Sequence, residues 1–301
     1  MTFSSVYLAI LFDCLLGEPR QFHPLVGFGR IAQRIQNAFH KAKSPRGQFI
    51  SGVLAWSIVV LPPVALLTTL PNNLLFESVV LYFCIAPRSL REHAEQVLKP
   101  LIHCDIVGAR TALGQIVSRD TGELNKSDIR KGAIESVLEN GSDGVFAPIF
   151  WFVVLGAPGA LLYRLSNTLD AMWGYKTTQW QHFGCFAARI DDVLNWLPAR
   201  LVALSYAFLG KRSLAFQAWR EQAHLCASPN AGPVMTAGAG ALSITLGGEA
   251  RYHGKTVHKP EIGYGPAPEN NDVERAMALV QKTLMLWCCL LAVAEGLFYA
   301  Y

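Results

Sequence analysis

Residues 48–70 read QFISGVLAWSIVVLPPVALLTTL and contain no charged side chain. A helix of about 20 apolar residues crosses the hydrocarbon core of a bilayer, so this stretch is long enough to span it. The 301-residue chain is 51% hydrophobic and only 16% charged, against about 25% charged in an ordinary soluble domain. Because its apolar residues are clustered, we predict a transmembrane helix here.

Four further apolar runs lie at residues 2–17, 74–86, 145–163 and 283–300. Any short one alone fits a buried core helix, but the five together favour an integral membrane protein. No run alternates with period two for long enough to predict a sheet. We therefore expect an all-α, polytopic membrane protein with about four to five spanning or re-entrant helices and cytoplasmic helical loops. The polar segments 164–196 and 247–272 are expected to be irregular.

The run at 145–163 (VFAPIFWFVVLGAPGALLY) is interrupted by Gly156-Ala157-Pro158-Gly159. A full crossing would place the polar segments on either side of it on opposite faces of the membrane. Non-helical backbone at that depth is tolerated where protein or a polar cavity surrounds it. We predict a re-entrant hairpin of two half-helices, which keeps both polar segments on one face.

Charge and cysteine content limit the classes of function. The loop 18–47 carries six Lys and Arg against one acid, so the positive-inside rule predicts that this loop of a multi-pass protein is cytoplasmic. The net charge of +4 is spread out, unlike that of a nucleic-acid binder. Seven cysteines without a C-x-x-C pair indicate neither a disulfide framework nor a zinc site.

Helix signals place the polar residues between the apolar runs. A capping box after Pro87 predicts a helix from Leu90, and Pro100 should end or bend it. Asp105 can cap a second helix, to about Val117. Ser127 can cap a third, which we expect to run to Glu139 and stop at Asn140-Gly141. We expect one membrane-embedded domain over 1–301, with its chemistry in a polar block at about 119–200.

The first candidate cluster follows Arg119-Asp120-Thr121. Glu135 and Glu139 share a helix face, and Lys131 with Glu135 alone fits a solvated face. The following Glu139-Asn140-Gly141-Ser142-Asp143-Gly144 gathers oxygen ligands on a Gly-rich turn beside an apolar run. Such ligands suit Mg²⁺, which takes one or two carboxylates and leaves the rest to phosphate and water.

The second candidate cluster is Asn167-Thr168-Leu169-Asp170, followed by Trp173 and Lys176. Asn167 and Asp170 are three residues apart, so one helical turn presents both on one side. Trp173 fits an aromatic belt at the membrane interface. Asp170 has no such structural explanation, which makes it a candidate for chemistry.

The third candidate cluster runs from Arg189 to Arg200. Asp191 and Asp192 diverge by about 100° on a helix, and one of them shares a face with Asn195. Adjacent acids at a membrane edge cost free energy unless they are paired or bind metal. Arg189 and Arg200 fit equally as structural partners or as phosphate ligands. These residue types point to a site for Mg²⁺ and phosphates, without naming a substrate; no P-loop, H-E-x-x-H or G-x-S-x-G motif is present.

In order along the chain, these motifs resemble the CobD/CbiB family, the membrane-bound adenosylcobinamide-phosphate synthases of cobalamin biosynthesis. The matching stretches are Asp13–Pro19 with His23-Pro24, Arg119–Thr121, Glu135–Asn140 with Asp143-Gly144, Gly156–Ala160, Asn167–Lys176, Phe183-Gly184, Ala188–Asp192, Asn195-Trp196, Pro198–Leu201, Ser228–Gly232, Leu246–Gly248 and Lys259-Pro260. The chain departs from the family at Pro233, where Trp is common, and at Gly141, where Thr or Ala often stands.

The resemblance implies a ligase that forms a carbon–nitrogen bond. ATP would activate a free propionate carboxylate of adenosylcobyric acid, and the amine of aminopropanol phosphate or ethanolamine phosphate would then form the amide of adenosylcobinamide phosphate. Mg²⁺ and cationic side chains would neutralise the developing phosphate charge. The expected partners are these substrates, membrane lipid and other late cobalamin-pathway membrane enzymes, but not nucleic acid.

The same chemistry suggests a role for each candidate residue. The catalytic candidates, among them a base that frees the amine, are Glu135, Glu139, Asp143 and Asp192. The candidates for Mg²⁺ are Asp143, Asp170, Asp191 and Asp192. The candidates for phosphate and substrate are Arg119, Asn140, Asn167, Lys176, Arg189, Asn195, Arg200 and Asn230.

Two other classes of membrane protein fit part of this motif pattern. A prenyltransferase-like membrane enzyme would bind Mg²⁺-diphosphate through Asp191-Asp192-x-x-Asn195. Such enzymes carry two Asp-rich motifs, however, and Asn167-x-x-Asp170 is a poor match to the second because it contains only one acid. A non-catalytic membrane sensor of the related AmpE type would share the scaffold and lose the acidic motifs, all of which are present here. Both comparisons favour the enzyme.

Overall fold

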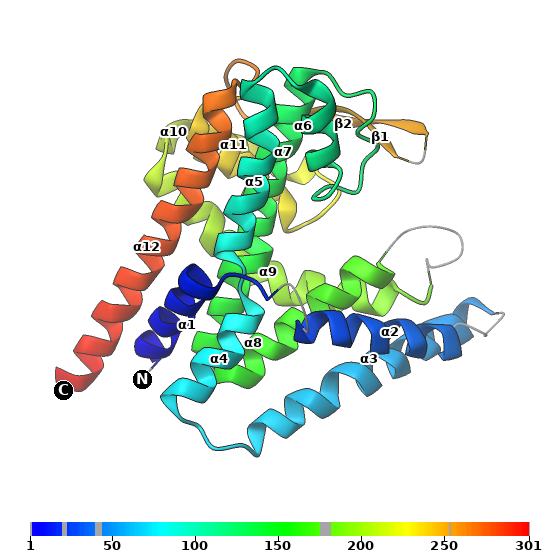
Figure 1. The fold of residues 1–301 in the computed structure, drawn as a ribbon, viewed down its shortest axis with the longest axis vertical. Helices are drawn as coiled ribbons and strands as arrows, with labels where there is room; N and C mark the ends of the chain where they lie inside the picture. The colour runs from blue at the N-terminus through cyan, green and yellow to red at the C-terminus, as the bar shows by residue number, and fades with distance from the viewer. Residues whose placement is uncertain (1, 20–22, 40–43, 175–181, 253, 301) are drawn as a thin grey trace. The chain divides into compact units, whose positions relative to one another are not determined.

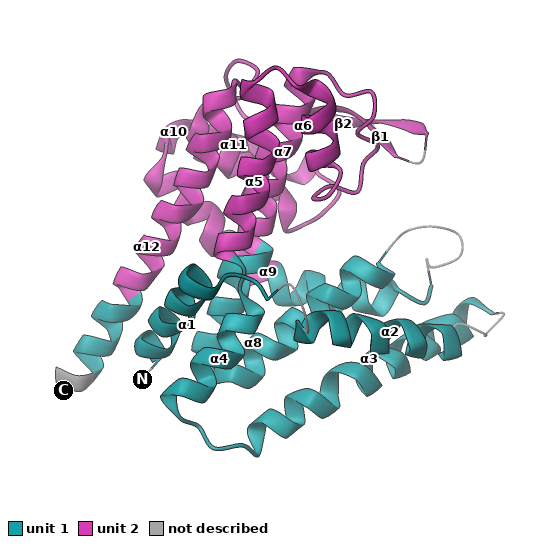
Figure 2. Ribbon diagram, viewed as in Figure 1, with its two compact units in different colours: residues 1–86, 143–195, 291–301 teal, residues 87–142, 196–290 magenta. Residues whose placement is uncertain are grey.

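The computed structural model describes residues 2–19, 23–39, 44–174, 182–252 and 254–300. The chain is predominantly helical and forms two compact units (Figure 2). Unit 1 comprises residues 1–86, 143–195 and 291–301, and unit 2 comprises residues 87–142 and 196–290. The predicted polar block at 119–200 is therefore divided between the two units.

Figure 1 labels the elements of each unit. Unit 1 contains α1 (Thr2–Leu16), α2 (Pro24–Phe39), α3 (Pro45–Thr68), α4 (Leu74–Cys84) and α8 (Ala147–Trp173). Unit 2 contains α5 (Pro87–Ile102), α6 (Ile106–Leu113), α7 (Lys126–Gly141), α10 (Arg212–Gln222), the short 3₁₀ turn η2 (Ala223–Leu225), α11 (Ala231–Leu242), β1 (Leu246–Tyr252) and β2 (Lys255–Ile262). The helices α9 (Cys185–Leu209) and α12 (Asn270–Ala300) contribute residues to both.

Three helical segments of the described chain are long and apolar enough to cross a membrane: Pro45–Thr68, Lys126–Trp173 and Asn270–Phe298. Within the protein, only 28% of the most apolar window of Pro45–Thr68 is buried, and only 22% of that of Asn270–Phe298. Exposed apolar side chains such as Leu54 on α3 and Val293 on α12 make these surfaces suited to lipid. The expected spans at 48–70 and 283–300 are thus confirmed as helices of spanning length and composition. In contrast, α1 and α4 are shorter.

The apolar run at 145–163 contains a sharp break in α8. Gly156 has φ 68° and ψ −159°, a conformation that only glycine adopts readily. A Cβ atom placed on Gly159 would lie 2.4 Å from the carbonyl oxygen of Trp151, eight residues earlier. A straight helix would separate these residues by about 12 Å, so the chain reverses at Gly156. The predicted division into two half-helices is confirmed, and its place in a membrane stays a prediction.

The core of unit 1 forms where α2, α3, α8 and the start of α9 pack together. Trp56 of α3 and Leu169 of α8 are among its buried members. The ring centroids of Trp173 and Phe183 lie 5.2 Å apart, and neither ring is exposed. The expectation that Trp173 belongs to an interfacial belt is therefore wrong, because its ring fills the protein core.

The core of unit 2 is built on α11, whose residues from Gly232 to Leu242 are buried except Met235. Its small Gly and Ala side chains let α10 approach closely, and the two helices lie side by side (Figure 1). The middle of α7 is also buried along its length, from Gly132 to Leu138. This packing explains how a polar residue such as Glu135 comes to lie inside the unit.

The chain does not stop at Asn140-Gly141 as predicted. Gly141 stays helical, and α7 continues through a π-helical turn (Ser142–Phe146) into α8. A Cβ atom on Gly141 would lie 3.1 Å from Val280, so the glycine serves close packing rather than a left-handed helix end. The supposed flexible turn is ordered helix, and π-helical turns frequently mark functional sites.

Other boundaries differ by a few residues. Helix α5 starts at Pro87 rather than Leu90, since proline is tolerated in a first helical turn. It also continues past Pro100 to Ile102. Asp105 caps α6 as predicted, accepting a hydrogen bond from the Gly108 amide at 2.9 Å, but the helix ends at Leu113. Asn125 caps α7 in place of Ser127.

The segment predicted to be irregular at 247–272 contains an antiparallel hairpin of β1 and β2. Two glycines and Pro260 disturb the alternation that would have predicted strands. Gly247, with φ 79°, lies at a register shift where a Cβ atom would meet the Pro260 carbonyl oxygen at 2.1 Å. The hairpin is therefore a local exception in a helical fold.

Candidate functional site

Unit 1 contains a cluster of acids and amides, here called the carboxylate cluster: Asn167, Asp170, Asp191 and Asn195. The first two lie one turn apart on α8, and the last two lie one turn apart on α9. The Nδ2 atom of Asn167 donates to Asp191 Oδ1 at 3.2 Å, and that of Asn195 donates to Oδ2 at 3.0 Å. Two amides therefore hold both oxygens of the Asp191 carboxylate: helical spacing predicted that Asn195 would share a face with one acid, whereas the contact of Asn167 with Asp191 depends on the packing of α8 against α9.

The carboxylate cluster is electrostatically unfavourable as it stands. Asp191 is 8% exposed. Burial, reinforced by the charge of Asp170, raises the pKa of Asp191 from its ordinary value of 3.8 to about 7, and the hydrogen bonds from Asn167 and Asn195 only partly oppose this. A buried acid whose pKa is raised by a neighbouring acid is stabilised in its charged form when a cation binds.

The donor set fits Mg²⁺, which prefers oxygen ligands and commonly binds through one or two carboxylates. The cluster supplies two carboxylates, oriented by amides. No group of three His, Cys, Asp or Glu side chains suited to a metal occurs in the described part of the chain. The residues therefore fit an ion that completes its coordination with water or phosphate, rather than an all-protein cage.

The residues around the carboxylate cluster contact Asp191 less closely than Asn167 and Asn195 do. Tyr163 donates to Asn195 Oδ1 at 2.8 Å, and the charge of Asp143 acts on that hydroxyl. Asp192 is the weakest of the charges that act on Asp191, as expected for a residue that points to another side of the helix. Arg189 is exposed. Lys176 lies outside the described residues.

In unit 2, Arg119 and Glu135 form a buried ion pair whose side chains are only 7% and 6% exposed. The other oxygen of Glu135 accepts a hydrogen bond from the Gly247 amide of the hairpin at 3.0 Å. Lys131 donates to the Gly247 carbonyl at 3.1 Å, so it does not form the solvated pair with Glu135 that its spacing suggested. These contacts fasten the hairpin to α7.

Asp120 holds the far end of the same hairpin. Its amide donates to the Arg251 carbonyl at 2.7 Å, and its carboxylate accepts from the Gly254 amide at 2.8 Å. The Arg119-Asp120-Thr121 motif and the Leu246-Gly247-Gly248 motif are thus parts of one structural contact. In this structure the guanidinium of Arg119 is engaged by a carboxylate.

Glu139 is half-buried near this ion pair. The charges that act on it are those of Lys259, Glu135 and Arg119. The next residue, Asn140, is exposed and donates to Ser136 of its own helix at 2.8 Å. Of the two predicted bases, Glu139 is therefore the one without an ion-pair partner within 4 Å among the described residues.

Arg200 and Asn230, predicted to bind substrate, meet in unit 2. The guanidinium of Arg200 donates to Asn230 Oδ1 at 3.1 Å and to the Pro229 carbonyl at 3.2 Å. It also lies 4.3 Å from the centre of the Trp196 ring. Burial lowers the pKa of Arg200, and a partly desolvated cation is stabilised when an anion binds. The guanidinium is therefore preorganised for an anionic ligand.

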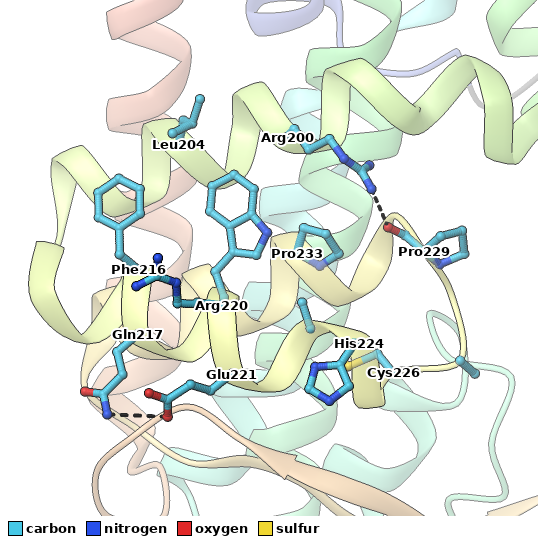
Figure 3. Close-up of a pocket in the computed structure, with 13 residues that line it drawn as sticks. Arg200, Leu204, Phe216, Gln217, Arg220, Glu221, His224, Cys226, Pro229 and Pro233 are labelled. Atoms are coloured by element: carbon cyan, nitrogen blue, oxygen red, sulfur yellow. Dashed lines mark hydrogen bonds between the residues drawn. The ribbon is translucent and has the colours of Figure 1, made fainter.

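Arg200 lines a cavity of about 1160 Å³ (Figure 3). Its other lining residues come from α9, α10, η2, α11 and the segment before α11: Leu204, Phe216, Gln217, Trp219, Arg220, Glu221, Ala223, His224, Cys226, Ala227, Pro229 and Pro233. Among these, Pro233 is the position where the chain departs from its family pattern. Trp219 and Arg220 of α10 and His224 of η2 were not predicted, because an aromatic and two basic residues in these elements form no motif.

The cavity adjoins the ion-pair region of unit 2. Burial raises the pKa of the Cys226 thiol in the cavity wall, and the charge of Glu135 raises it further. Lys259 and Glu139 are also close enough to act on this thiol. A ligand in the cavity would therefore lie near the predicted base Glu139.

Comparison with known proteins gives a consistent result. The family model described as CobD/Cbib protein matches residues 6–280. The cobalamin biosynthesis protein CobD of Stutzerimonas stutzeri is 51% identical, over 98% of this chain and 99% of the relative. The protein of the same name from Chromobacterium violaceum is 50% identical, over 94% and 93%. A probable CobD of Pyrococcus furiosus is 36% identical, over 90% of both chains. No solved structure matches.

Proposed function

This chain belongs to the CobD/CbiB family of cobalamin biosynthesis proteins, and we propose that it is an ATP- and Mg²⁺-dependent amide ligase. It joins the amine of aminopropanol phosphate, or of ethanolamine phosphate, to the free propionate carboxylate of adenosylcobyric acid. The product is adenosylcobinamide phosphate. The observation that carries the proposal beyond the family is the buried Asp191 beside the partly exposed Asp170, because two neighbouring acids favour a bound cation.

A carboxylate at neutral pH is a poor electrophile and requires activation. Attack of a carboxylate oxygen on the γ-phosphorus of ATP forms an acyl phosphate and releases ADP. Attack of the amine nitrogen on the acyl carbon then forms the amide and releases phosphate, while a base takes the proton of the amine. When bound, Mg²⁺ would neutralise negative charge on the phosphate groups in the first step.

The side chains of this protein have distinct parts in that scheme. Asp170 and Asp191 would hold the ion, and Asn167 and Asn195 fix the orientation of the Asp191 carboxylate. Glu139 is the proposed base, since Glu135 is already engaged by Arg119 and the hairpin. The proposed location is the bacterial inner membrane, with the site on the cytoplasmic face.

The proposal is tested with the purified full-length protein in detergent or nanodiscs. Incubation with adenosylcobyric acid, ATP, Mg²⁺ and each amino-alcohol phosphate should yield adenosylcobinamide phosphate, or its ethanolamine counterpart, with one ADP per amide. A membrane sensor or a prenyltransferase-like enzyme would yield neither. In cells, the gene should restore growth of a synthase-deficient strain supplied with cobyric acid as its only corrinoid, and failure in both assays would reject the ligase.

A further inference from the structure

The cavity of unit 2 contains basic side chains that the structure does not neutralise. Arg220 and His224 line it and are exposed. Among the described residues, neither takes part in a hydrogen bond or ion pair, and Arg200 bonds only to neutral oxygens. Figure 3 shows them on the lining of one cavity. Arginine cations on a concave surface that form no ion pair of their own attract an anionic ligand.

The one carboxylate in the lining is already occupied. Glu221 accepts a hydrogen bond from the Tyr264 hydroxyl, outside the cavity lining, and another from Gln217 at 3.5 Å. In Figure 3 the Gln217–Glu221 pair lies at the opposite end of the lining from Arg200 and Pro229. Two arginines, Arg200 and Arg220, face this one carboxylate, so the lining keeps a net charge of +1, and His224 adds a ring that can donate a hydrogen bond.

We propose that this cavity binds the phosphate groups of a phosphorylated substrate, with Arg220 and His224 as phosphate-binding residues beside Arg200. The inference rests on the proposed function, because it assigns one of the two phosphorylated substrates to this cavity. It adds Arg220 and His224, which belong to none of the sequence motifs, to the candidate phosphate-binding residues. Arginine suits this role because its planar donors match phosphate oxygens.

The size and walls of the cavity favour the nucleotide over the amino-alcohol phosphate. A volume of about 1160 Å³ is at the upper end of small-molecule sites and much larger than a three-carbon phosphate requires. The Phe216 and Trp219 rings in the wall are nearly parallel, at 11°, with centroids 6.3 Å apart. Such aromatic surfaces bind a planar base by stacking. ATP is therefore the expected occupant.

The test measures equilibrium binding to the full-length protein in detergent, with Mg²⁺ present and no corrinoid. The probes are a non-hydrolysable ATP analogue, aminopropanol phosphate and inorganic phosphate. Arg220→Gln should weaken binding of the analogue roughly tenfold to a hundredfold, because a charge-assisted hydrogen bond is lost. His224→Gln should weaken it less. The matched control is Lys211→Gln at the start of the same helix, since Lys211 is exposed, is absent from the lining and should not affect binding.

The outcomes separate this inference from the ligase proposal, because binding is measured without turnover. Weaker binding of the analogue by Arg220→Gln, with binding by Lys211→Gln unchanged, supports a nucleotide in the cavity. Weaker binding of aminopropanol phosphate alone supports the phosphate site and assigns it to the other substrate. If the wild type binds no probe, or Arg220→Gln weakens none of them, the inference is overturned. Arg220 has no internal hydrogen bond or ion pair among the described residues, so its substitution should leave the fold intact.

Discussion

The two polar clusters of this protein are buried to a similar degree but differ in how their charges are balanced. In unit 2, Glu135 is matched by Arg119 and by a backbone amide, so the group is satisfied within the protein. In unit 1, Asp191 is matched only by neutral amides and lies near a second acid. Burial of like charges destabilises a fold unless a ligand offsets it. From this difference we propose that Arg119 and Glu135 serve structure and that Asp191, with Asp170 nearby, serves function.

The largest expected effect comes from breaking the satisfied pair. Glu135→Gln leaves the buried Arg119 cation without its partner and should lower the free energy of unfolding by about 3 to 5 kcal/mol. The loss should show first as faster hydrogen exchange in the hairpin Leu246–Ile262, which Glu135 fastens. Replacing both Arg119 and Glu135 with apolar residues of similar volume should recover most of the stability. An unchanged thermal unfolding profile for Glu135→Gln would contradict the structural assignment.

Removing the charge of Asp191 should lower activity without lowering stability. Asp191→Asn keeps a side chain that can hydrogen-bond to Asn167 and Asn195 but removes one of the two negative charges. We expect ligation to slow on the order of 10² to 10³-fold, because charge stabilisation in the transition state is lost, with stability equal or higher. The assay is product formation across a Mg²⁺ titration, beside a thermal melt. Full activity at limiting Mg²⁺ would remove Asp191 from the metal site.

The pH dependence of stability sharpens the same contrast. The pKa of Asp191 is raised from 3.8 to about 7, so between these values the folded state binds more protons than the unfolded state. Stability therefore falls as pH rises through that window, by about 2 kcal/mol between about pH 5.5 and pH 8. Denaturant unfolding across this pH range, with a metal chelator present, would measure this change in the free energy of unfolding. Asp191→Asn should lack this contribution, and an identical pH profile for both proteins would exclude the shift.

The smallest effect is expected at the exposed ion pair of the hairpin. Arg251 pairs with Glu123, but their side chains are 46% and 81% exposed. Arg251→Ala should change the free energy of unfolding by less than about 1 kcal/mol, since solvent screens exposed pairs. The same denaturant experiment compares it with Glu135→Gln. A loss as large as that of the buried variant would show that burial does not separate the two pairs.

Sequence patterns anticipated the elements whose signals are local. Unbroken apolar runs predicted the membrane helices, the Gly156–Gly159 break predicted the reversal in α8, and helical spacing predicted that Asn195 would share a face with one acid. Local patterns failed where packing decides. Trp173 suggested an interface but lies in a core, and Gly141 suggested a helix end but fits against Val280. The hairpin was missed because its glycines and Pro260 obscure the alternation of a strand.

By itself, the sequence determined that this is a helical membrane protein with acids, amides and arginines in ordered motifs, because hydrophobicity and helical spacing are properties of neighbouring residues. The tertiary structure alone decided which of those charges are matched. Arg119 and Glu135 are 16 residues apart in sequence, and Gly247 is 112 residues from Glu135. Only folding brings them together, and only folding brings the charge of Asp170 close enough to act on Asp191. The balance of charge depends on contacts between distant segments, which no local pattern encodes.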